Sequence, residues 1–600
     1  MPWLGPVLAL TVVATLAAIA YLRPLRKSRQ VDARRLAEWG RPKGRDPDPA
    51  LVGVYHAARV SKRGGAGALD ARTWDDLDLD AVFAFLDRTE SVPGRQVLYD
   101  RLRSTTHSPE SLAAFDDLAE RFRDGPFRLR TQRWLEPLNA QSVYWLWSLA
   151  LEPIERLPRW AAVYPIFAVL MLVSICLIPA FHPLAVVSAL GLIVGILLRA
   201  RFGFRLVPIA NSFRDMVRLL NAADRFADAP ELAEELRGEL KARLAALARV
   251  RQFGGWLGRD TGGADLVGLF IEYLNLLFCL DANAVMLAVA EMRRRQGDLH
   301  AVFETVGSLD AALAVASVRA SGLAWTRPIF APPVAAAIFD DVRHPLVDEC
   351  VPNSITLGSP AGVLVTGANM TGKSTFLRTI GVNAVLAQTI HTVFASRYEA
   401  PWLSVHSCIT PADDLQAGKS YYQAEVETLV AMLRAAGSEN VRLSLFDELF
   451  RGTNTLDRIG AASAVLEYLV RGSTPSPPPE PADGRTPESA VQSPVSGVPA
   501  PEEAARPQIV DGRGGRCFVL AATHDLELVS LLTPDYAVVH FADQLGDNTL
   551  QFDYKLRPGP TTTRNAIALL GVLGAPQEVV AEALGRTERL REGRRNPAES

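Results

Sequence analysis

The chain has few cysteines and almost no net charge, and both facts narrow its class. Only five cysteines occur among 600 residues, and no two of them form a C-x-x-C pair. Thiols of this kind fit a reduced, cytoplasmic protein and suggest neither a disulfide framework nor a zinc site. The net charge of -3 has no excess of either sign that would by itself indicate nucleic acid. The length leaves room for several domains.

Charged residues are also missing from the run Trp3 to Leu22. At about 1.5 Å per residue, this run is long enough to cross the roughly 30 Å hydrocarbon core of a bilayer. A cleaved signal peptide would carry its basic residues before the run, whereas here they follow it, so an uncleaved anchor is expected. Basic residues on the carboxyl side place the rest of the chain in the cytoplasm.

A second uncharged run, Ala161 to Leu198, is too long for a single span. Phe181-His-Pro183 interrupts it, which predicts a hairpin of two spans, the second somewhat short. Arginines flank both ends, so both ends are expected in the cytoplasm. The sequence thus predicts a multi-pass protein of the inner (cytoplasmic) membrane with three transmembrane helices and a lipid bilayer as partner. The alternative is a buried helical hairpin in a soluble core.

A glycine-rich loop, Gly367 to Thr375, follows the apolar run Val363–Val365 and precedes a predicted helix. Its two glycines allow a tight loop whose N–H groups point at phosphates, at the positive end of the helix. Lys373 would supply a positive charge, and Ser374 a hydroxyl for Mg²⁺. The loop therefore predicts binding of a nucleoside triphosphate. The expected nucleotide-binding residues in it are Gly367, Ala368, Asn369, Met370, Thr371, Gly372, Lys373, Ser374 and Thr375.

Two further predicted strands end in polar side chains. Val441 to Phe446 runs into the pair Asp447-Glu448, in which Asp447 would join Ser374 in holding the metal and Glu448 would orient or deprotonate the attacking water. Phe518 to Ala522 runs into His524, which could sense the γ-phosphate or position the water. The alternative is a solvated acid pair and a structural histidine. The expected catalytic residues are Lys373, Glu448 and His524.

These segments together resemble the ATPase signature of the MutS DNA mismatch repair family. Asn-Met within the loop and Arg-Gly-Thr after the acid pair, in Asp447 to Thr453, are specific to that family. The resemblance implies an α/β P-loop ATPase domain of the ABC type that hydrolyses ATP with Mg²⁺. Ser420-Tyr-Tyr-Gln-Ala-Glu425 resembles the segment in which a serine of one subunit reaches the γ-phosphate held by the other. This implies a homodimer with composite ATP sites, Ser420 acting across it, and DNA as a partner.

The resemblance extends on both sides of this signature. Arg343-His-Pro345 and Val351-Pro-Asn353 match the start of the family's ATPase domain, and Tyr554 to Gly559 matches its closing segment. This chain has Cys350 where the family commonly has an aromatic residue that stacks on adenine, and Tyr421-Tyr422 where the family has Thr-Phe.

Helical periodicity surrounds the second apolar run. Phe85 to Thr89 and Gly94 to Leu98 resemble the start of the MutS core, or lever, region, and helices are predicted at Asp215 to Phe226 and Glu231 to Val250. The hairpin would therefore interrupt the lever and couple the state of the ATPase to the bilayer.

The expected organisation follows from these segments: an anchor at 1–22, a first core or lever part at 23–160, the hairpin at 161–198, a second core or lever part at 199–340 and the ATPase domain at 341–600. Residues 473–516 are rich in Pro, Ser, Gly, Ala and Glu and lack aromatic residues, so a disordered insertion is expected there.

Recognition of mismatches is not expected. The stretch before the hairpin has no room for the family's mismatch-reading domain, and Phe270-Ile-Glu272 lies in an apolar stretch that predicts a helical core segment rather than a Phe-x-Glu wedge. A basic cluster follows at Arg237 to Arg251, but acids are interleaved with it, as on a solvated helix face.

The leading hypothesis is a membrane-anchored MutS-like ATPase that works as a dimeric clamp on DNA or another elongated partner. The alternatives are a membrane scaffold that organises proteins without DNA and, less favoured, a transporter ATPase with fused spans.

Overall fold

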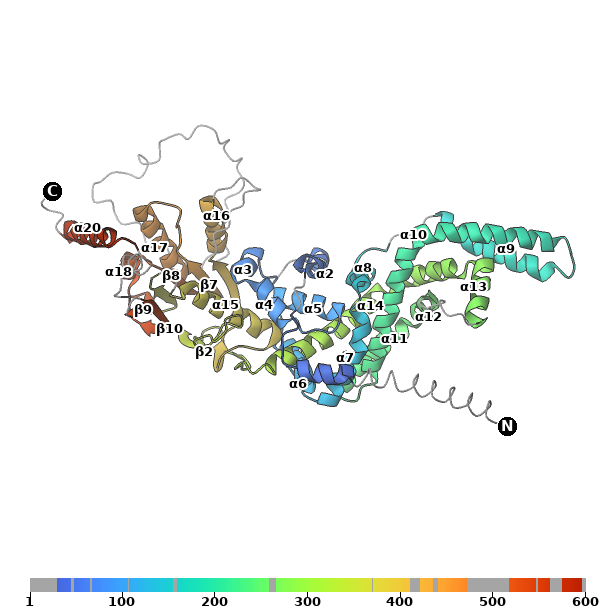
Figure 1. The fold of residues 1–600 in the computed structure, drawn as a ribbon, viewed down its shortest axis with the longest axis horizontal. Helices are drawn as coiled ribbons and strands as arrows, with labels where there is room; N and C mark the ends of the chain where they lie inside the picture. Colours follow the sequence, from blue (N-terminus) through green and yellow to red (C-terminus); the bar gives the residue numbers. More distant parts are fainter. Residues whose placement is uncertain are drawn as a thin grey trace, which may run out of the picture. The chain divides into compact units, whose positions relative to one another are not determined.

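A computed structural model of the chain divides into two compact units (Figure 1). It describes residues 30–44, 48–64, 67–105, 107–154, 159–257, 266–368, 371–409, 421–434, 441–471, 517–546, 549–561 and 575–595. Unit 1 consists of Met1–Leu69, Asp80–Leu323 and Gln388–His391, and unit 2 of Asp70–Leu79, Ala324–Ala387 and Thr392–Ser600. The predicted anchor at Trp3 to Leu22 and the predicted insertion at 473–516 lie outside the described residues.

Unit 1 is helical throughout its described part. Its helices are α2 (Pro49–Arg63), α4 (Leu79–Leu86), α5 (Val92–Arg103), α6 (Pro109–Arg121), α7 (Gly125–Leu135), η1 (Glu136–Leu138), η2 (Gln141–Trp145), α8 (Leu146–Leu151), η3 (Arg159–Ala162), α9 (Val163–Leu177), α10 (Leu184–Ala227), α11 (Glu234–Ala246), α12 (Ala248–Leu257), α13 (Leu266–Phe278) and α14 (Leu280–Arg319). Four of them start at a capping side chain followed by proline in the first turn; the caps are Asp48, Ser91, Ser108 and Asp124. A cap that accepts an N–H bond and a proline that needs none both favour a helix start.

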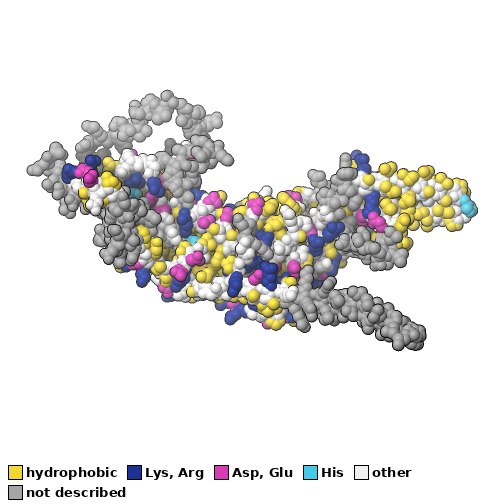
Figure 2. Space-filling view, viewed as in Figure 1, with side chains coloured by type: hydrophobic (Ala, Val, Ile, Leu, Met, Phe, Trp, Pro, Cys, Tyr) yellow, Lys and Arg dark blue, Asp and Glu magenta, His cyan; other side chains and the backbone are white. Residues whose placement is uncertain are grey.

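The apolar run at 161–198 forms the predicted hairpin. α9 and the first part of α10 lie side by side and are joined by the turn around Phe181 (Figure 1). The helices pack closely because Gly191 has no side chain: a Cβ there would lie 2.3 Å from the sulfur of Met171. A hydrogen bond of 2.9 Å joins the hydroxyls of Ser174 and Ser188 across the pair. Figure 2 shows hydrophobic side chains over almost all of the visible hairpin, with charged side chains at its base.

Two helices after the hairpin differ from their predicted limits. The helix predicted at Asp215 to Phe226 is the end of the 44-residue α10, which continues from the apolar run without a break. The helix predicted at Glu231 to Val250 is divided into α11 and α12, with Leu247, at φ -90° and ψ 0°, between them. The first of these begins at Glu234, three residues after the predicted start at Glu231.

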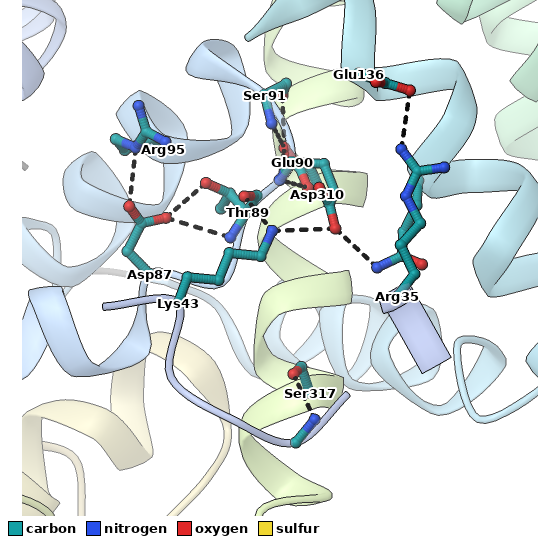
Figure 3. A network of polar contacts seen from close by, with 12 residues as sticks. Arg35, Lys43, Asp87, Thr89, Glu90, Ser91, Arg95, Glu136, Asp310 and Ser317 are labelled. Carbon is teal, nitrogen blue, oxygen red and sulfur yellow. Dashed lines mark hydrogen bonds and ion pairs between the residues drawn. The ribbon is translucent and has the colours of Figure 1, made fainter. Parts of the chain in front are cut away.

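A buried acid fastens α5 to the long helix α14 (Figure 3). The Asp310 carboxylate of α14 accepts hydrogen bonds from the backbone N–H of Glu90 at 2.9 Å, and from the N–H and hydroxyl of Ser91 at 2.8 and 2.5 Å. Burial raises the pKa of Asp310 to about 6. Gly94 leaves room for this carboxylate, because a Cβ there would lie 2.1 Å from its Oδ2.

The segment Phe85 to Thr89, which contains the string Leu86-Asp-Arg-Thr89, is a second part of this junction. Asp87 accepts bonds from the N–H and hydroxyl of Thr89 at 3.2 and 2.6 Å, and from Nε of Arg95 at 2.8 Å (Figure 3). Arg95 in turn donates to the hydroxyl of Tyr144 at 2.6 Å. The string thus works as a buried polar turn that sets the start of α5.

Unit 2 contains two sheets. Its strands are β1 (Ile329–Phe330), β2 (Ala337–Val342), β3 (Asn353–Leu357), β4 (Gly362–Thr366), β5 (Arg397–Ala400), β6 (Leu403–Cys408), β7 (Val441–Asp447), β8 (Cys517–Thr523), β9 (Tyr536–Gly546) and β10 (Thr549–Pro558). Its helices are α3 (Ala71–Asp76), α15 (Lys373–Ile390), α16 (Tyr421–Arg434), α17 (Thr455–Arg471), α18 (Leu526–Leu532) and α20 (Gln577–Arg595). The smaller sheet has the order β1-β5-β2-β3, and the larger one β10-β9-β4-β8-β7-β6.

The larger sheet places three predicted strands next to one another. β4, β8 and β7 are parallel neighbours, with Thr366 opposite Thr523 and Asp447 opposite Ala522. All five residues of β4 and all seven of β8 are buried, as expected for strands covered on both faces. The carboxyl ends of the three strands therefore meet at one edge of the sheet.

The short helix α3 is far in sequence from the rest of unit 2. Its Asp76 carboxylate accepts hydrogen bonds from the Ser407 hydroxyl and the Ile409 N–H, both at 2.8 Å, at the end of β6. Thr73 accepts from the Ser407 N–H at 3.0 Å. Leu77 packs where Gly381 of α15 leaves space, since a Cβ there would lie 2.6 Å away. A segment some 330 residues upstream thus completes the packing around β6.

Candidate functional site

The glycine-rich loop joins β4 to α15, as its sequence predicts. Gly367 and Gly372 have φ values of +145° and +101°, a region in which glycine is favoured over other residues. A Cβ on Gly367 would also lie 2.9 Å from the carbonyl oxygen of Phe541. Backbone geometry therefore requires glycine at both ends of this loop.

Lys373 is folded back over the loop. Its Nζ donates to the carbonyl oxygens of Gly367 and Ala368 at 2.8 and 2.9 Å, and the Thr371 hydroxyl donates to Ala368 at 2.8 Å. Burial lowers the pKa of Lys373, while Glu448 and Asp447 oppose that shift. The ammonium group is thus held inside the loop, close to two carboxylates.

The first acid of the pair lies against the loop. The hydroxyl of Ser374, at the start of α15, donates a hydrogen bond to Oδ2 of Asp447, at the end of β7. Burial raises the pKa of Asp447, and the bond from Ser374 opposes the rise. A carboxylate and a hydroxyl side by side are the hard oxygen donors that Mg²⁺ takes from a protein when phosphates supply further ligands. The pair therefore fits this cation.

The second acid is paired with the histidine at the end of β8. Oε1 of Glu448 lies 3.2 Å from Nδ1 of His524, and Oε2 lies 3.5 Å from Nε of Arg451. The hydrogen bond with His524 lowers the pKa of Glu448, and the same bond raises the pKa of His524. Glu448 has φ +51°, and its N–H donates to the Ala522 carbonyl at 3.0 Å. This turn directs the side chain towards the end of β8.

The histidine is itself held by the next residue. Asp525 forms two hydrogen bonds of 2.9 Å with the guanidinium of Arg458 in α17, and its Oδ1 lies 3.6 Å from Nε2 of His524. An arginine and a carboxylate joined twice form one of the more rigid polar contacts in proteins. The imidazole therefore lies between two acids, Glu448 and Asp525.

One residue of the site has a role that the sequence did not suggest. Glu425 of α16 is buried, and its Oε1 accepts a hydrogen bond of 2.7 Å from the backbone N–H of Phe450. Its Oε2 is buried and has no hydrogen-bond partner among the residues that the structure describes, and burial raises the pKa of Glu425. Phe450, like Glu448, has a positive φ, of +58°. Glu425 therefore ties α16 to the turn that carries Glu448.

A cavity of about 300 Å³ lies beside the loop. Its lining includes Cys350, Asn353, Phe376, Phe541 and Tyr554. The side chain of Asn353 accepts from the N–H of Leu556 at 2.7 Å and donates to the carbonyl of Tyr554 at 2.9 Å, so it fixes the strand that carries Tyr554. The ring of Tyr554 is a possible stacking surface at a place where Cys350 supplies none.

Not every predicted site residue can be placed. Asn369, Met370 and Ser420 lie outside the described residues, while Thr375 is exposed at the start of α15. Within the described ranges, no group of three or more His, Cys, Asp and Glu side chains is placed to hold a metal. The structure brings together Lys373, Ser374, Asp447, Glu448 and His524.

Taken together, unit 2 is a mixed α/β unit whose polar residues gather at the carboxyl ends of adjacent parallel strands, next to a glycine-rich turn. Residues 363–475 match the family model described as MutS domain V. Over 306 residues, the chain is 31% identical to the DNA mismatch repair protein MutS of Thermus thermophilus, covering 50% of this chain and 31% of that protein. About half of the chain is therefore similar to MutS proteins, and this half includes the residues that resemble their domain V.

Two further relatives described as DNA mismatch repair proteins are similar to this chain. The chain is 38% identical over 190 residues to the DNA mismatch repair protein MutS of a Synechococcus species, covering 30% of this chain and 21% of that protein. It is 30% identical over 301 residues to the DNA mismatch repair protein MutS 2 of Halobacterium salinarum, covering 49% and 29%. These alignments span less than a third of the length of each relative.

Proposed function

We propose that this protein binds and hydrolyses ATP with Mg²⁺ in unit 2, and that the reaction drives a dimeric, membrane-anchored clamp related to mismatch repair. One observation carries the proposal: the glycine-rich loop, the acid pair and the histidine lie at the ends of three adjacent parallel strands, β4, β7 and β8. Ligands bind at this edge of parallel α/β sheets.

Each side chain has a definite task in such a reaction. Lys373 would leave the loop carbonyls to neutralise charge on the β- and γ-phosphates. Ser374 and Asp447 would hold Mg²⁺, which supplies charge neutralisation on the phosphate oxygens. Glu448 would orient the attacking water and accept its proton, and the pKa that His524 keeps low leaves Glu448 ionised for that work. His524 would keep the carboxylate in position.

The cavity beside the loop would take the base. Tyr554 would stack on adenine in place of the aromatic residue that the family has at the position of Cys350. Gly372 and Thr375, at the start of α15, also line this cavity. The base and the phosphates would therefore occupy neighbouring parts of the same unit.

A dimer and a DNA partner are proposed from the family alone. The curated relatives are named as DNA mismatch repair proteins. The basic cluster after the hairpin adds little to the case for DNA, because several of its members are paired with acids: Lys241 lies 3.2 Å from Asp228 and Arg243 lies 2.9 Å from Asp298. Such pairs are typical of a solvated helix face.

The hairpin supports a membrane location in the same proposal. Among the described residues, three helices are long and apolar enough to cross a membrane: Arg159–Leu177, Leu184–Arg201 and Leu280–Arg319. The apolar window of the third is 78% buried in the protein, whereas that of the second is only 6% buried. Side chains that are apolar and unpacked need an apolar solvent, so the first two helices are the proposed spans and the third is a core helix.

ATP turnover of the detergent-solubilised protein tests the proposal. It should be compared with Glu448→Gln, with and without homoduplex, mismatched and single-stranded DNA, at two salt concentrations. We expect turnover that the variant loses and that DNA stimulates less at high salt, because phosphate contacts weaken with salt. Absence of turnover in the folded protein would refute the ATPase, and turnover that no DNA changes would refute the DNA clamp.

A further inference from the structure

We propose that α13 and the start of α14 form a re-entrant helical turn that enters the cytoplasmic edge of the bilayer beside the hairpin. The inference rests on the proposed membrane insertion of that hairpin. It assigns a lipid-facing role to a segment too short to span a membrane, since α13 has only 13 residues.

Two contacts with α10 show which part of the hairpin lies beside α13. A Cβ on Gly195 of α10 would lie 2.3 Å from the backbone carbonyl oxygen of Leu276, so only glycine allows this close approach. One turn further along α10, Arg199 forms an ion pair of 2.7 Å with Glu272 of α13. The end of α13 therefore lies beside the apolar part of the hairpin, and its middle lies beside the first charged residue.

That charged level has the features of a membrane–water boundary. The guanidinium of Arg201 lies 5.5 Å from the centre of the Trp160 ring, at the base of the hairpin. Tryptophan and arginine both favour the region of the lipid headgroups. The ion pair between Arg199 and Glu272 lies in the same turn of α10, so everything beyond it towards the hairpin tip faces hydrocarbon.

The outer face of α13 is apolar and uncovered. Phe270 is 63% exposed and Tyr273 56% exposed, and a spacing of three residues puts both on one face of the helix. The sequence predicts a core helix here, and the helix is present, but Phe270 does not contribute to the core. Leu287, on the first turns of α14, is 52% exposed as well. Tyr273 lies one residue beyond Glu272 towards the hairpin tip, whereas Phe270 lies two residues before it, at the level of the headgroups. Because α13 packs against both α9 and α10, the exposed faces of these helices adjoin, which identifies lipid as the occupant.

Side chains of the protein itself form hydrogen bonds with the polar groups of the turn between α13 and α14. Asn275, which is buried, bonds the Asp281 carboxylate and accepts from the Asp281 N–H at 3.0 Å. The side chain of Asn283 donates to the carbonyls of Phe278 and Cys279 at 2.9 and 3.1 Å. Non-helical backbone is tolerated at membrane depth only when the protein itself satisfies its polar groups, and here two asparagines do so.

Spin-label accessibility of the full-length protein in phosphatidylcholine and phosphatidylglycerol vesicles tests the inference. One cysteine is added in place of Tyr273 or Leu287 in a background from which the exposed Cys176 has been removed by Cys176→Ser, and the same background without an added cysteine gives the labelling of the four remaining thiols as the baseline. Leu190→Cys in the hairpin reports whether the hairpin is in lipid. Leu456→Cys, at a site 82% exposed in unit 2, is the aqueous control.

We expect labels at positions 273 and 287 to collide with oxygen far more than with a water-soluble nickel complex, as at position 190, and label 456 to show the opposite preference. If label 190 is in lipid while labels 273 and 287 are in water, the re-entrant turn is refuted and the membrane hairpin stands. If label 190 is in water, both proposals fail. Two label positions are used so that the test does not depend on a single variant. Thermal unfolding of each variant shows whether it is folded.

Discussion

Replacing Glu425 by alanine should slow ATP turnover without weakening ATP binding. The Glu425 carboxylate is the acceptor for the Phe450 N–H at 2.7 Å, and the turn that it holds places Glu448. A hydrogen bond to a charged group contributes about 1.5–3 kcal/mol. Since about 1.4 kcal/mol is a factor of ten, loss of the bond would lower the equilibrium constant for the working turn by roughly 10- to 100-fold, and kcat by up to that factor.

The variants can separate this role from simple destabilisation. Glu425→Gln keeps an oxygen that can accept from Phe450, so its kcat should lie between wild type and Glu425→Ala. Glu427→Ala changes an exposed acid on the same helix and is the matched control. The assay is steady-state ATP turnover, with KM and thermal unfolding measured beside kcat. A folded Glu425→Ala protein with the kcat of wild type would refute the argument, and a rise in KM alone would assign Glu425 to binding instead.

Three further predictions concern other parts of the chain. Gly94→Ala should destabilise unit 1 by about 1–3 kcal/mol, because the new Cβ would collide with the buried carboxylate of Asp310. Gly297→Ala is the control and should not destabilise it, because the space around Gly297 is open. Thermal unfolding of the two variants measures the difference. The pKa of His524 is raised in the folded protein and the pKa of Glu448 is lowered, so the pair stabilises the fold fully between the unfolded-state pKa values of about 4.5 for glutamate and 6.5 for histidine. This stabilisation is lost as the pH rises through the folded-state pKa of His524, and also as the pH falls through the folded-state pKa of Glu448. The Tm advantage over His524→Gln should therefore be greatest at mildly acidic pH, and an advantage that grows towards alkaline pH would contradict this. Tyr554→Ala should weaken ATP binding by about 1–3 kcal/mol in a titration with a fluorescent ATP analogue, while Tyr554→Phe should not.

Local patterns predicted much of the fold. The strands that lead into the loop, the acid pair and His524 all form near their predicted positions, because buried apolar runs that end in polar residues are a local signal. The hairpin was also predicted, since its length and lack of charge need no knowledge of the rest of the chain. Family resemblance then supplied the roles that local patterns leave open.

Contacts between distant segments could not be predicted. Nothing near Asp76 in the sequence indicates that it bonds the end of β6, and nothing in α16 indicates that Glu425 holds the turn at Phe450. Helix limits were also missed: α11 ends and α12 begins at either side of Leu247, and no proline or glycine at that position marks the interruption. Burial of a polar side chain is a property of the assembled fold, and a single sequence gives little signal for it.

The position of α3 has a consequence for synthesis of the protein. The Asp76 carboxylate and the Ser407 hydroxyl are 331 residues apart in the chain. At about 5–20 residues per second, the ribosome needs roughly 17 to 66 s to make the residues between them. The hairpin is synthesised within that interval, so the amino-terminal piece of unit 2 is made long before its partners at the end of β6. Unit 2 therefore cannot finish folding before the residues of the hairpin have been synthesised, and under the proposed function the order of synthesis would place the membrane segment ahead of an active ATPase.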